Sequence, residues 1–415
     1  MKKVLGCFAK KTSWMKQNLV MAKLQRKTVK IGLDKVLDGQ NSTLTNGRVG
    51  LICNPASVNR EFRHAADLFF ENAGIKLTAL FGPQHGIRGD VQYNMVETSH
   101  ATDRLTGLPV YSLYSETRQP TAAMLADIDV LVFDLQDVGC RVYTFIYTMA
   151  NAMKACAAFG KKMIILDRPN PIGGSGVEGG TLEIGHESFV GQYPIPMRHG
   201  LTVGELARLF NAEYAIHCDL EVVTMDNWAR ADFYDETDAP WVMPSPNMPT
   251  VDTAFVFPAT VFIEGTELSE GRGTTRPFEI VGSPYINGKN WAAVLKSLEL
   301  PGVIFRPIHF LPTFQEFAGQ ECEGVFLHVT DREVFEPVIT GLALVKTIYE
   351  AYPGDFKWRA GGYEYEFERN PFDVIAGTSE IRKMIENGKS VAEIKLSWQT
   401  DVNKFNRIRE KYLLY

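Results

Sequence analysis

The sequence predicts an α/β protein, with a Rossmann-like parallel sheet domain followed by a second, smaller α/β domain. From about residue 48, short apolar runs without polar alternation are separated by helical stretches. This pattern is typical of parallel strands covered by helices on both faces. The length of 415 residues exceeds what one ordinary core accommodates, so two domains are expected.

The strands and helices of the first domain alternate along the chain. Apolar, β-like runs predict strands at residues 49–55, 75–81, 110–114, 129–135 and 162–167. Helical stretches are predicted at residues 60–73, 122–126, 143–159 and 202–214. The last helix begins with a capping box, because Thr202 is a suitable N-cap and Glu205 follows three residues later.

The second domain is predicted from less regular patterns. Residues 240–290 are rich in Pro, Gly and Thr and are expected to be mostly loops. Beyond them, strands are predicted at 303–310 and 324–329, and helices at 337–351, 372–387 and 400–412. We therefore assign residues 35–240 to the Rossmann-like domain, residues 241–415 to the smaller C-terminal α/β domain, and residues 1–34 to a poorly ordered leader.

Composition and charge exclude several classes of protein. The net charge is −6 and 45% of the residues are hydrophobic, so neither nucleic acid nor an anionic membrane surface is an expected partner. No apolar run reaches the roughly 18 residues of a membrane span, so no membrane insertion is expected. Lys10, Lys11 and Lys16 interrupt the apolar residues near the N-terminus, and a secretory signal needs about 7–15 such residues in a row. The sequence therefore predicts no clear export signal.

The familiar metal and cofactor motifs do not occur in a suitable context. The six cysteines are scattered without a C-x-x-C pair, so neither a zinc site nor a disulfide framework is predicted. Residues 174–179 match G-x-G-x-x-G, but Pro169 and Pro171 precede them and no helical pattern follows. We expect no metal and no cofactor, and a nucleotide-dependent enzyme would rest on fold analogy alone.

Polar groups, glycines and prolines follow four of the predicted strands. In parallel sheets, functional groups gather beyond the carboxyl ends of the strands. The four segments that meet this rule are residues 54–57, 82–86, 136–139 and 168–171. Their coincidence predicts a functional site at this edge of the sheet.

Five motifs in order resemble the exo-β-N-acetylmuramidase (NamZ-type) family, and the likeness covers roughly residues 35–415. They are residues 80–89, 133–144, 166–171 with 177–179, 244–250 and 264–279. The resemblance implies a Rossmann-like catalytic domain and a smaller α/β domain with a cleft between them. It also implies removal of single N-acetylmuramic acid units from the non-reducing ends of peptidoglycan fragments, in bacterial cell-wall turnover and recycling. Such a substrate indicates the periplasm or export, whereas the N-terminus leaves a cytoplasmic role open, and the oligomeric state is not indicated.

Glycoside hydrolysis usually needs two carboxyl groups, although an N-acetyl sugar can use its own acetamide with the help of one carboxylate. Our catalytic candidates are Glu178, Glu264, Glu270 and Asp137, which lie in motif loops rich in Gly or Pro. Three of them have a structural alternative. Asp137 is equally suited to capping a helix that begins near Arg141, and Glu264 and Glu270 are suited to ion pairs with Arg272 or Arg276.

The candidates for substrate binding are polar and aromatic residues of the same motifs: Gln84, His85, Arg88, Arg141, Tyr143, Arg168, Asn170, Asn247, Arg272 and Arg276. N-acetylmuramic acid carries a lactyl carboxylate, and guanidinium groups bind carboxylates in a bidentate manner. We therefore expect at least one of the five arginines to bind the lactyl group. The structural alternatives are loop hydrogen bonding for His85 and core packing for Tyr143.

Gln84 departs from the family pattern, which has Glu in the Pro-x-His-Gly motif. An amide cannot donate or accept a proton as a carboxyl group does at neutral pH. Either Gln84 binds substrate and another acid does the work, or the activity is reduced or altered. The alternative function is a non-catalytic glycan-binding protein with the same fold.

Overall fold

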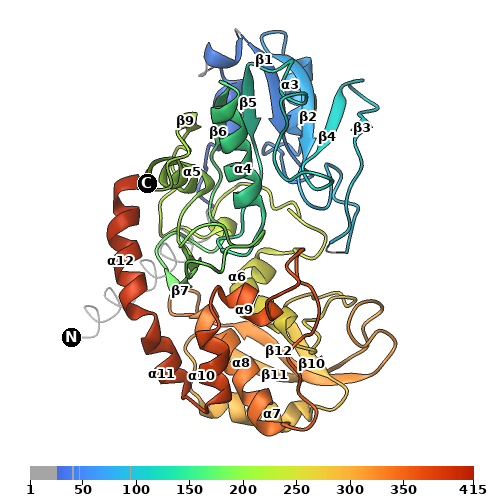
Figure 1. Ribbon diagram of the computed structural model, residues 1–415, viewed down its shortest axis with the longest axis vertical. Coiled ribbons are helices and arrows are strands. Elements are labelled where there is room, and N and C mark those ends of the chain that lie inside the picture. The colour runs from blue at the N-terminus through green and yellow to red at the C-terminus, as the bar shows by residue number, and fades with distance from the viewer. Residues whose placement is uncertain (1–25, 40–41, 46, 94) are drawn as a thin grey trace, which may run out of the picture.

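The computed structural model describes residues 26–39, 42–45, 47–93 and 95–415. Figure 1 shows two α/β domains arranged along the long axis of the molecule, with the N-terminal domain above the C-terminal one. The predicted α/β class is confirmed, with a mostly parallel sheet in the first domain and an antiparallel sheet in the second.

The first domain is built on a seven-stranded sheet in the order β3-β4-β2-β1-β5-β6-β9. All neighbouring strands are parallel except β3 and β4. The strands are β1 (Arg48–Ile52), β2 (Lys76–Gly82), β3 (Ala101–Thr102), β4 (Pro109–Ser112), β5 (Val130–Phe133), β6 (Lys162–Leu166) and β9 (Asp219–Val223). The sequence predicted the five central strands of the sheet but neither β3 nor β9.

Helices cover both faces of this sheet, which explains why the central strands lack polar alternation. Helices α4 (Phe145–Ala158) and α5 (Val203–Glu213) contribute to one hydrophobic cluster with Phe133 and Ile165. Helices α2 (Gly32–Leu37) and α3 (Ala65–Glu71) contribute to a separate cluster with Val132 and Ile164. Because β5 and β6 each supply side chains to both clusters, the parallel sheet separates two cores.

Two predicted helices of the first domain differ from the structure. Residues 122–126 form turns rather than a helix. The helix predicted at 60–73 begins only at Ala65, because the His64 ring accepts a hydrogen bond from the amide of Ala66 and acts as the N-cap. The capping box at Thr202 and Glu205 is confirmed at the start of α5.

Residues 26–34, which the sequence placed in a poorly ordered leader, pack against the first domain. The side chains of Val29, Ile31 and Leu33 are buried in the sheet core. The amide of Gly32 donates to the carbonyl of Asp167 at 2.9 Å, and a Cβ at Gly32 would lie 2.6 Å from the Asp167 nitrogen. Alternating apolar side chains thus join this segment to the sheet. Residues 1–25 lie outside the described residues.

The second domain contains a three-stranded antiparallel sheet in the order β10-β12-β11. Its strands are β10 (Ile280–Ser283), β11 (Val303–Phe310) and β12 (Cys322–Val329), and its helices are α6 (Val251–Thr260), α7 (Gly288–Ser297), α8 (Pro337–Ala351), α9 (Pro371–Ala376), α10 (Glu380–Glu386), α11 (Val391–Ser397) and α12 (Gln399–Arg409). A hairpin-like pair, β7 (Glu178–Thr181) and β8 (Pro196–Arg198), lies at the junction with the first domain.

The predictions for the second domain are confirmed for β11, β12 and α8, but they missed one helix and joined two others. Residues 240–290 lie mostly outside helices and strands, as expected, but they contain α6, which begins at the N-cap Thr250 and is almost entirely buried. The helix predicted at 372–387 is two helices, since Gly377 adopts a left-handed φ of 75° and ends α9. None of the described helices is long and apolar enough to cross a membrane. The five described cysteines are free and buried.

The C-terminal segment returns to the first domain. In Figure 1, α11 and α12 run up the side of the molecule and end beside α5 and β9. The hydroxyl of Tyr415 donates to the Asp167 carboxylate at 2.8 Å, and the amide of Leu414 donates to Glu205 at 2.8 Å. The two domains are therefore held together by the end of the chain as well as by their connection near residue 250.

Candidate active site

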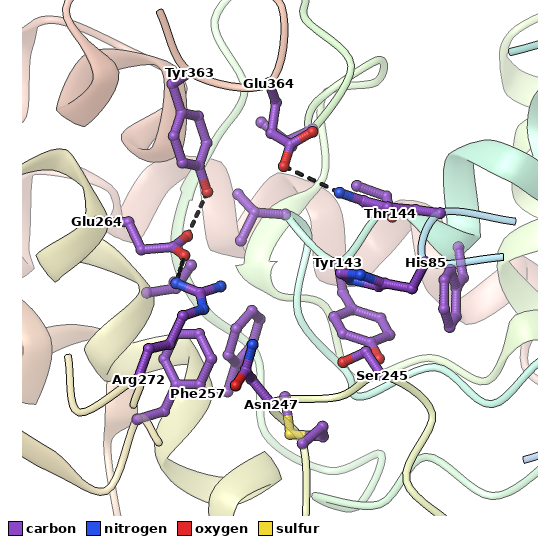
Figure 2. A pocket seen from close by; sticks show the side chains of 17 residues that line it. His85, Tyr143, Thr144, Ser245, Asn247, Phe257, Glu264, Arg272, Tyr363 and Glu364 are labelled. Carbon is purple, nitrogen blue, oxygen red and sulfur yellow. Dashed lines mark hydrogen bonds and ion pairs between the residues drawn. The ribbon is translucent and has the colours of Figure 1, made fainter. Parts of the chain in front are cut away.

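A pocket lies between the two domains, with an empty volume of about 530 Å³. The first domain supplies the loop after β2 and the segment that leads into α4, and the second supplies α6, the 3-10 turn Val261–Gly265, the loop after it and the loop near residue 363. Figure 2 shows polar side chains from both domains around one open space. Concave surfaces with apolar walls and a few converging polar groups are the usual form of small-ligand sites, so the pocket is a candidate binding site.

One polar cluster of the pocket is centred on Glu364. Its Oε1 accepts a hydrogen bond from the amide nitrogen of Gln84 at 3.1 Å, and its Oε2 accepts one from the Tyr114 hydroxyl at 2.7 Å. Thr144 in turn donates to the amide oxygen of Gln84 at 2.7 Å. Glu364 is 4% exposed, and burial raises the pKa of its carboxyl group. No cation is within ion-pair distance of it among the described residues.

A second cluster joins Glu264 to a cation. One guanidinium nitrogen of Arg272, Nη1, contacts both Glu264 and Glu270, and the Tyr363 hydroxyl donates to the other Glu264 oxygen at 2.6 Å. The dashed lines in Figure 2 mark the contacts of Glu264 with Arg272 and Tyr363. Burial opposes the charge of Arg272, but the two carboxylates raise the pKa of the guanidinium. Glu264 is therefore paired with a cation and hydrogen-bonded at both of its carboxylate oxygens.

The remaining wall combines rings and small polar groups. Burial lowers the pKa of His85 to about 4, so the imidazole is neutral near pH 7, and its Nδ1 hydrogen-bonds to the carbonyl of Val91 at 2.7 Å. Tyr143, Asn247 and Phe257 also line the pocket. Burial raises the pKa of the Tyr143 hydroxyl. These groups offer aromatic faces and hydrogen bonds to a sugar.

The structure brings six predicted site residues to this pocket: Gln84, His85, Tyr143, Asn247, Glu264 and Arg272. Glu270 does not line it but contacts Arg272 from behind, at 2.6 Å. Their functional roles stay predictions.

Two other carboxylates that were predicted to be catalytic do not line the pocket. Asp137 accepts a hydrogen bond from the amide of Gly139 at 2.7 Å and lies 3.3 Å from the His199 ring, so it orders the turn after β5. Glu178 accepts the amide hydrogens of Val338 and Ile339 at 3.0 and 2.7 Å. It therefore caps the N-terminus of α8, where a negative charge is favourable.

The other predicted binding residues have structural contacts elsewhere. Arg141 donates to the carbonyls of Gly180, Ile195, Ile375 and Ala376 and so connects the two domains. Arg168 forms a buried bidentate ion pair with Asp134, and Asn170 donates to the carbonyl of Leu201. Arg88 and Arg276 are exposed and pair with Asp103 and Glu279.

Replacing Glu178 with alanine tests the structural role of this carboxylate. The change leaves two buried amide hydrogens at the start of α8 without acceptors, which costs about 1–3 kcal/mol for each lost partner. We expect a lower unfolding free energy in urea, with kcat of the folded enzyme within about twofold of wild type. A folded variant with kcat reduced more than a hundredfold would show instead that Glu178 acts in the chemistry.

Sequence reasoning missed Glu364, Tyr363 and Tyr114 as site residues, and it quoted Thr144 and Ser245 only as members of motifs. Glu364 lies 280 residues from its partner Gln84 in the sequence and outside all five motifs. The only local signal was the unusual pair of glycines, Gly361 and Gly362, before Tyr363, which by itself indicates no more than a turn. Within the described parts of the chain, no cluster of three His, Cys, Asp or Glu residues is suited to a metal ion.

Two buried glutamates that face one interdomain pocket fit a glycoside hydrolase. Two family models match the chain, "Exo-beta-N-acetylmuramidase NamZ, N-terminal" at residues 49–252 and the corresponding C-terminal model at residues 255–415. The chain therefore belongs to the exo-β-N-acetylmuramidase NamZ family, and it is a glycoside hydrolase of that class.

Individual relatives agree with this assignment. The chain is 51% identical over 387 residues to the peptidoglycan β-N-acetylmuramidase NamZ of Bacillus subtilis (strain 168), a match that covers 93% of this chain and 91% of the relative. Two crystal structures of DUF1343 family proteins from Bacteroides fragilis NCTC 9343 are similar throughout. One has a TM-score of 0.84 at 38% identity and the other a TM-score of 0.76 at 33% identity, and each match covers 93% of this chain and 99% of the solved chain.

Proposed function

We propose that this enzyme removes N-acetylmuramic acid from the non-reducing ends of peptidoglycan fragments, and that the interdomain pocket is its active site. The observation that carries this proposal is the placement of Glu264 and Glu364, two glutamates with different partners, in the wall of a single pocket.

Recognition of the lactyl carboxylate now rests on a single candidate among the five arginines. Arg272 is the only one of them that lines the pocket. Its Nη1 binds the two glutamates, and its guanidinium lies over the Phe278 ring at 4.7 Å. The other guanidinium nitrogens have no hydrogen-bond partner among the described residues, so they are available to a ligand. Glu264 and Glu270 already share the positive charge of Arg272. We therefore expect Arg272 to bind the lactyl carboxylate only weakly.

The direct test is turnover of a nitrophenyl β-glycoside of N-acetylmuramic acid beside the N-acetylglucosamine analogue. We expect chromophore release from the muramic compound and much less from the glucosamine compound. A folded protein that binds N-acetylmuramic acid without releasing chromophore would favour the glycan-binding alternative. Equal turnover of both compounds would contradict specificity for muramic acid.

The location of the enzyme is a separate proposal. Because peptidoglycan fragments arise outside the cytoplasmic membrane, we propose that the enzyme acts in the periplasm or after export. Fractionation of the native cells, with activity assayed in each fraction, tests this proposal. Activity confined to the cytoplasm would indicate instead that the enzyme acts on imported fragments.

A further inference from the structure

We propose that Glu364 is the catalytic acid of this enzyme and that the side chain of Glu264 is its partner, which stabilises positive charge on the sugar. This inference rests on the proposed function of the pocket. It assigns a proton donor to a chain whose Pro-x-His-Gly motif carries an amide, Gln84, and it divides the chemistry between two glutamates of the second domain.

The backbone presents Glu364 to the pocket at the tip of a strained turn. Tyr363 and Glu366 exchange two backbone hydrogen bonds, of 2.8 and 3.0 Å. The two residues between them, Glu364 and Tyr365, have φ values of 46° and 68°. A two-residue turn with positive φ at both central positions normally contains Asn and Gly. Side chains such as Glu and Tyr cost of order 1–3 kcal/mol each in such conformations, which persist mainly at functional sites.

Contacts around the turn hold this conformation. The Tyr365 hydroxyl donates to the carbonyl of Met95 at 3.2 Å, and the Tyr365 ring packs edge-on against Tyr114. Arg118 lies over both rings, 4.1 Å from the Tyr114 centroid and 4.6 Å from the Tyr365 centroid. The first domain thus fixes a turn of the second domain, and the Glu364 side chain points into the space between them, as Figure 2 shows.

The two glutamates differ in the groups that surround them. Glu264 contacts the guanidinium of Arg272. Glu364 has an amide and a phenol as partners, and these neutral groups compensate its burial less well. The Tyr114 hydroxyl can donate to a carboxylate and accept from a carboxylic acid, so it suits both protonation states. Burial raises the pKa of Glu364, and the nearby Glu264 charge adds to that rise. A glycosidase combines a carboxylic acid with a carboxylate that stabilises charge, and the different partners of these two glutamates fit that division.

Cleavage of the glycosidic bond begins with proton transfer. The carboxylic acid of Glu364 transfers its proton to the glycosidic oxygen while the bond from that oxygen to the anomeric carbon breaks. The bonding electrons leave with the oxygen, and the remaining sugar is released as an alcohol. The Glu264 carboxylate stabilises the positive charge that develops on the anomeric carbon. A water molecule then adds its oxygen to this carbon and returns a proton to Glu364, so the net reaction is hydrolysis.

Leaving groups of different basicity test this assignment in the full chain. Glu364→Gln should lower kcat by about 10²–10⁴-fold on a disaccharide, whose alcohol needs a proton to leave. On a dinitrophenyl glycoside, whose leaving group needs no proton, we expect a loss of less than about tenfold. The matched control is Glu368→Gln in the same loop. Its exposed side chain makes no hydrogen bond or ion pair with the described residues, so this variant should behave as wild type on both substrates.

The pH profile gives an independent readout. A catalytic acid works while it is protonated, so wild-type kcat/KM on the disaccharide should fall as the pH rises through the raised pKa of Glu364. This basic limb should be absent from Glu364→Gln. Equal losses on both substrates with the basic limb retained would overturn the assignment of Glu364, even if wild-type turnover confirms the proposed function.

A second variant separates a missing acid from a folding defect. Glu364→Ala leaves a space of carboxyl size beside Gln84 and Tyr114, which added sodium formate can enter. We expect formate to restore part of the disaccharide turnover and to leave wild type unchanged. A folded Glu364→Ala enzyme with undiminished activity, or with a loss that formate does not reduce, would count against a catalytic acid at this position.

Discussion

Replacing Glu264 with glutamine is expected to lower kcat on the order of 10⁴-fold, on substrates with good and poor leaving groups alike. Losses of this size accompany removal of one member of a catalytic unit. Glutamine keeps the shape of the side chain but removes the negative charge that faces the developing positive charge of the sugar. It also leaves Arg272 with one carboxylate, Glu270, instead of two. Steady-state kinetics on a disaccharide and on a dinitrophenyl glycoside measure the effect.

The pattern across substrates distinguishes Glu264 from Glu364. A stabiliser of charge is needed for every leaving group, whereas an acid is needed only for basic ones. The control is Glu267→Gln, an exposed position three residues away whose side chain is 3.9 Å from Lys357. A folded Glu264→Gln enzyme with kcat within tenfold of wild type would show that Glu264 only holds the Arg272 side chain in place and takes no part in the chemistry.

Replacing Arg168 with methionine is expected to destabilise the protein by about 3–5 kcal/mol, because it leaves the carboxylate of Asp134 buried without a cation. The two side chains are 3% and 0% exposed and lie 2.6 Å apart, at the carboxyl ends of neighbouring strands. Arg168 also donates to the carbonyl of Val58 at 3.2 Å. Equilibrium unfolding in urea, followed by circular dichroism, measures the loss.

The double variant Asp134→Leu, Arg168→Met provides the matching control. Removing both charges avoids the uncompensated carboxylate, so most of the lost stability should return. The kcat of the folded Arg168→Met enzyme should stay near the wild-type value, since Arg168 lies outside the pocket. A stable Arg168→Met enzyme with strongly raised KM would show instead that Arg168 binds the substrate, as the sequence suggested.

Secondary structure was predicted correctly where the sequence shows a continuous apolar run or where a helix is capped by residues close to it in the chain. The central strands were predictable because both of their faces are covered, which requires continuous apolar runs. The start of α5 was predictable because Thr202 and Glu205 satisfy each other's backbone amides within one turn. The predictions failed at α6 and at residues 26–34, where composition suggested loops or disorder but tertiary packing buried the segment.

The motifs contained residues that line the pocket together with residues that only support the fold, and they did not separate the two kinds. Arg141 and Arg168 stand in motifs beside polar loops, as Gln84 and His85 do. Only the fold shows that Arg141 donates its hydrogen bonds to backbone carbonyls and that Arg168 pairs with Asp134. A guanidinium binds a substrate carboxylate and a backbone carbonyl through the same donors, so residue type alone does not separate these two uses.

By itself, the sequence determined the α/β class, the family and the first-domain half of the pocket, because these follow from strand periodicity and from motifs contiguous in the chain. Only the tertiary structure decided which carboxyl groups share the pocket. The pairing of Glu364 with Gln84 spans 280 residues, and its partners come from two domains. The pKa of a carboxyl group depends on the charges, hydrogen-bond donors and burial around it. Those surroundings exist only after the two domains have met.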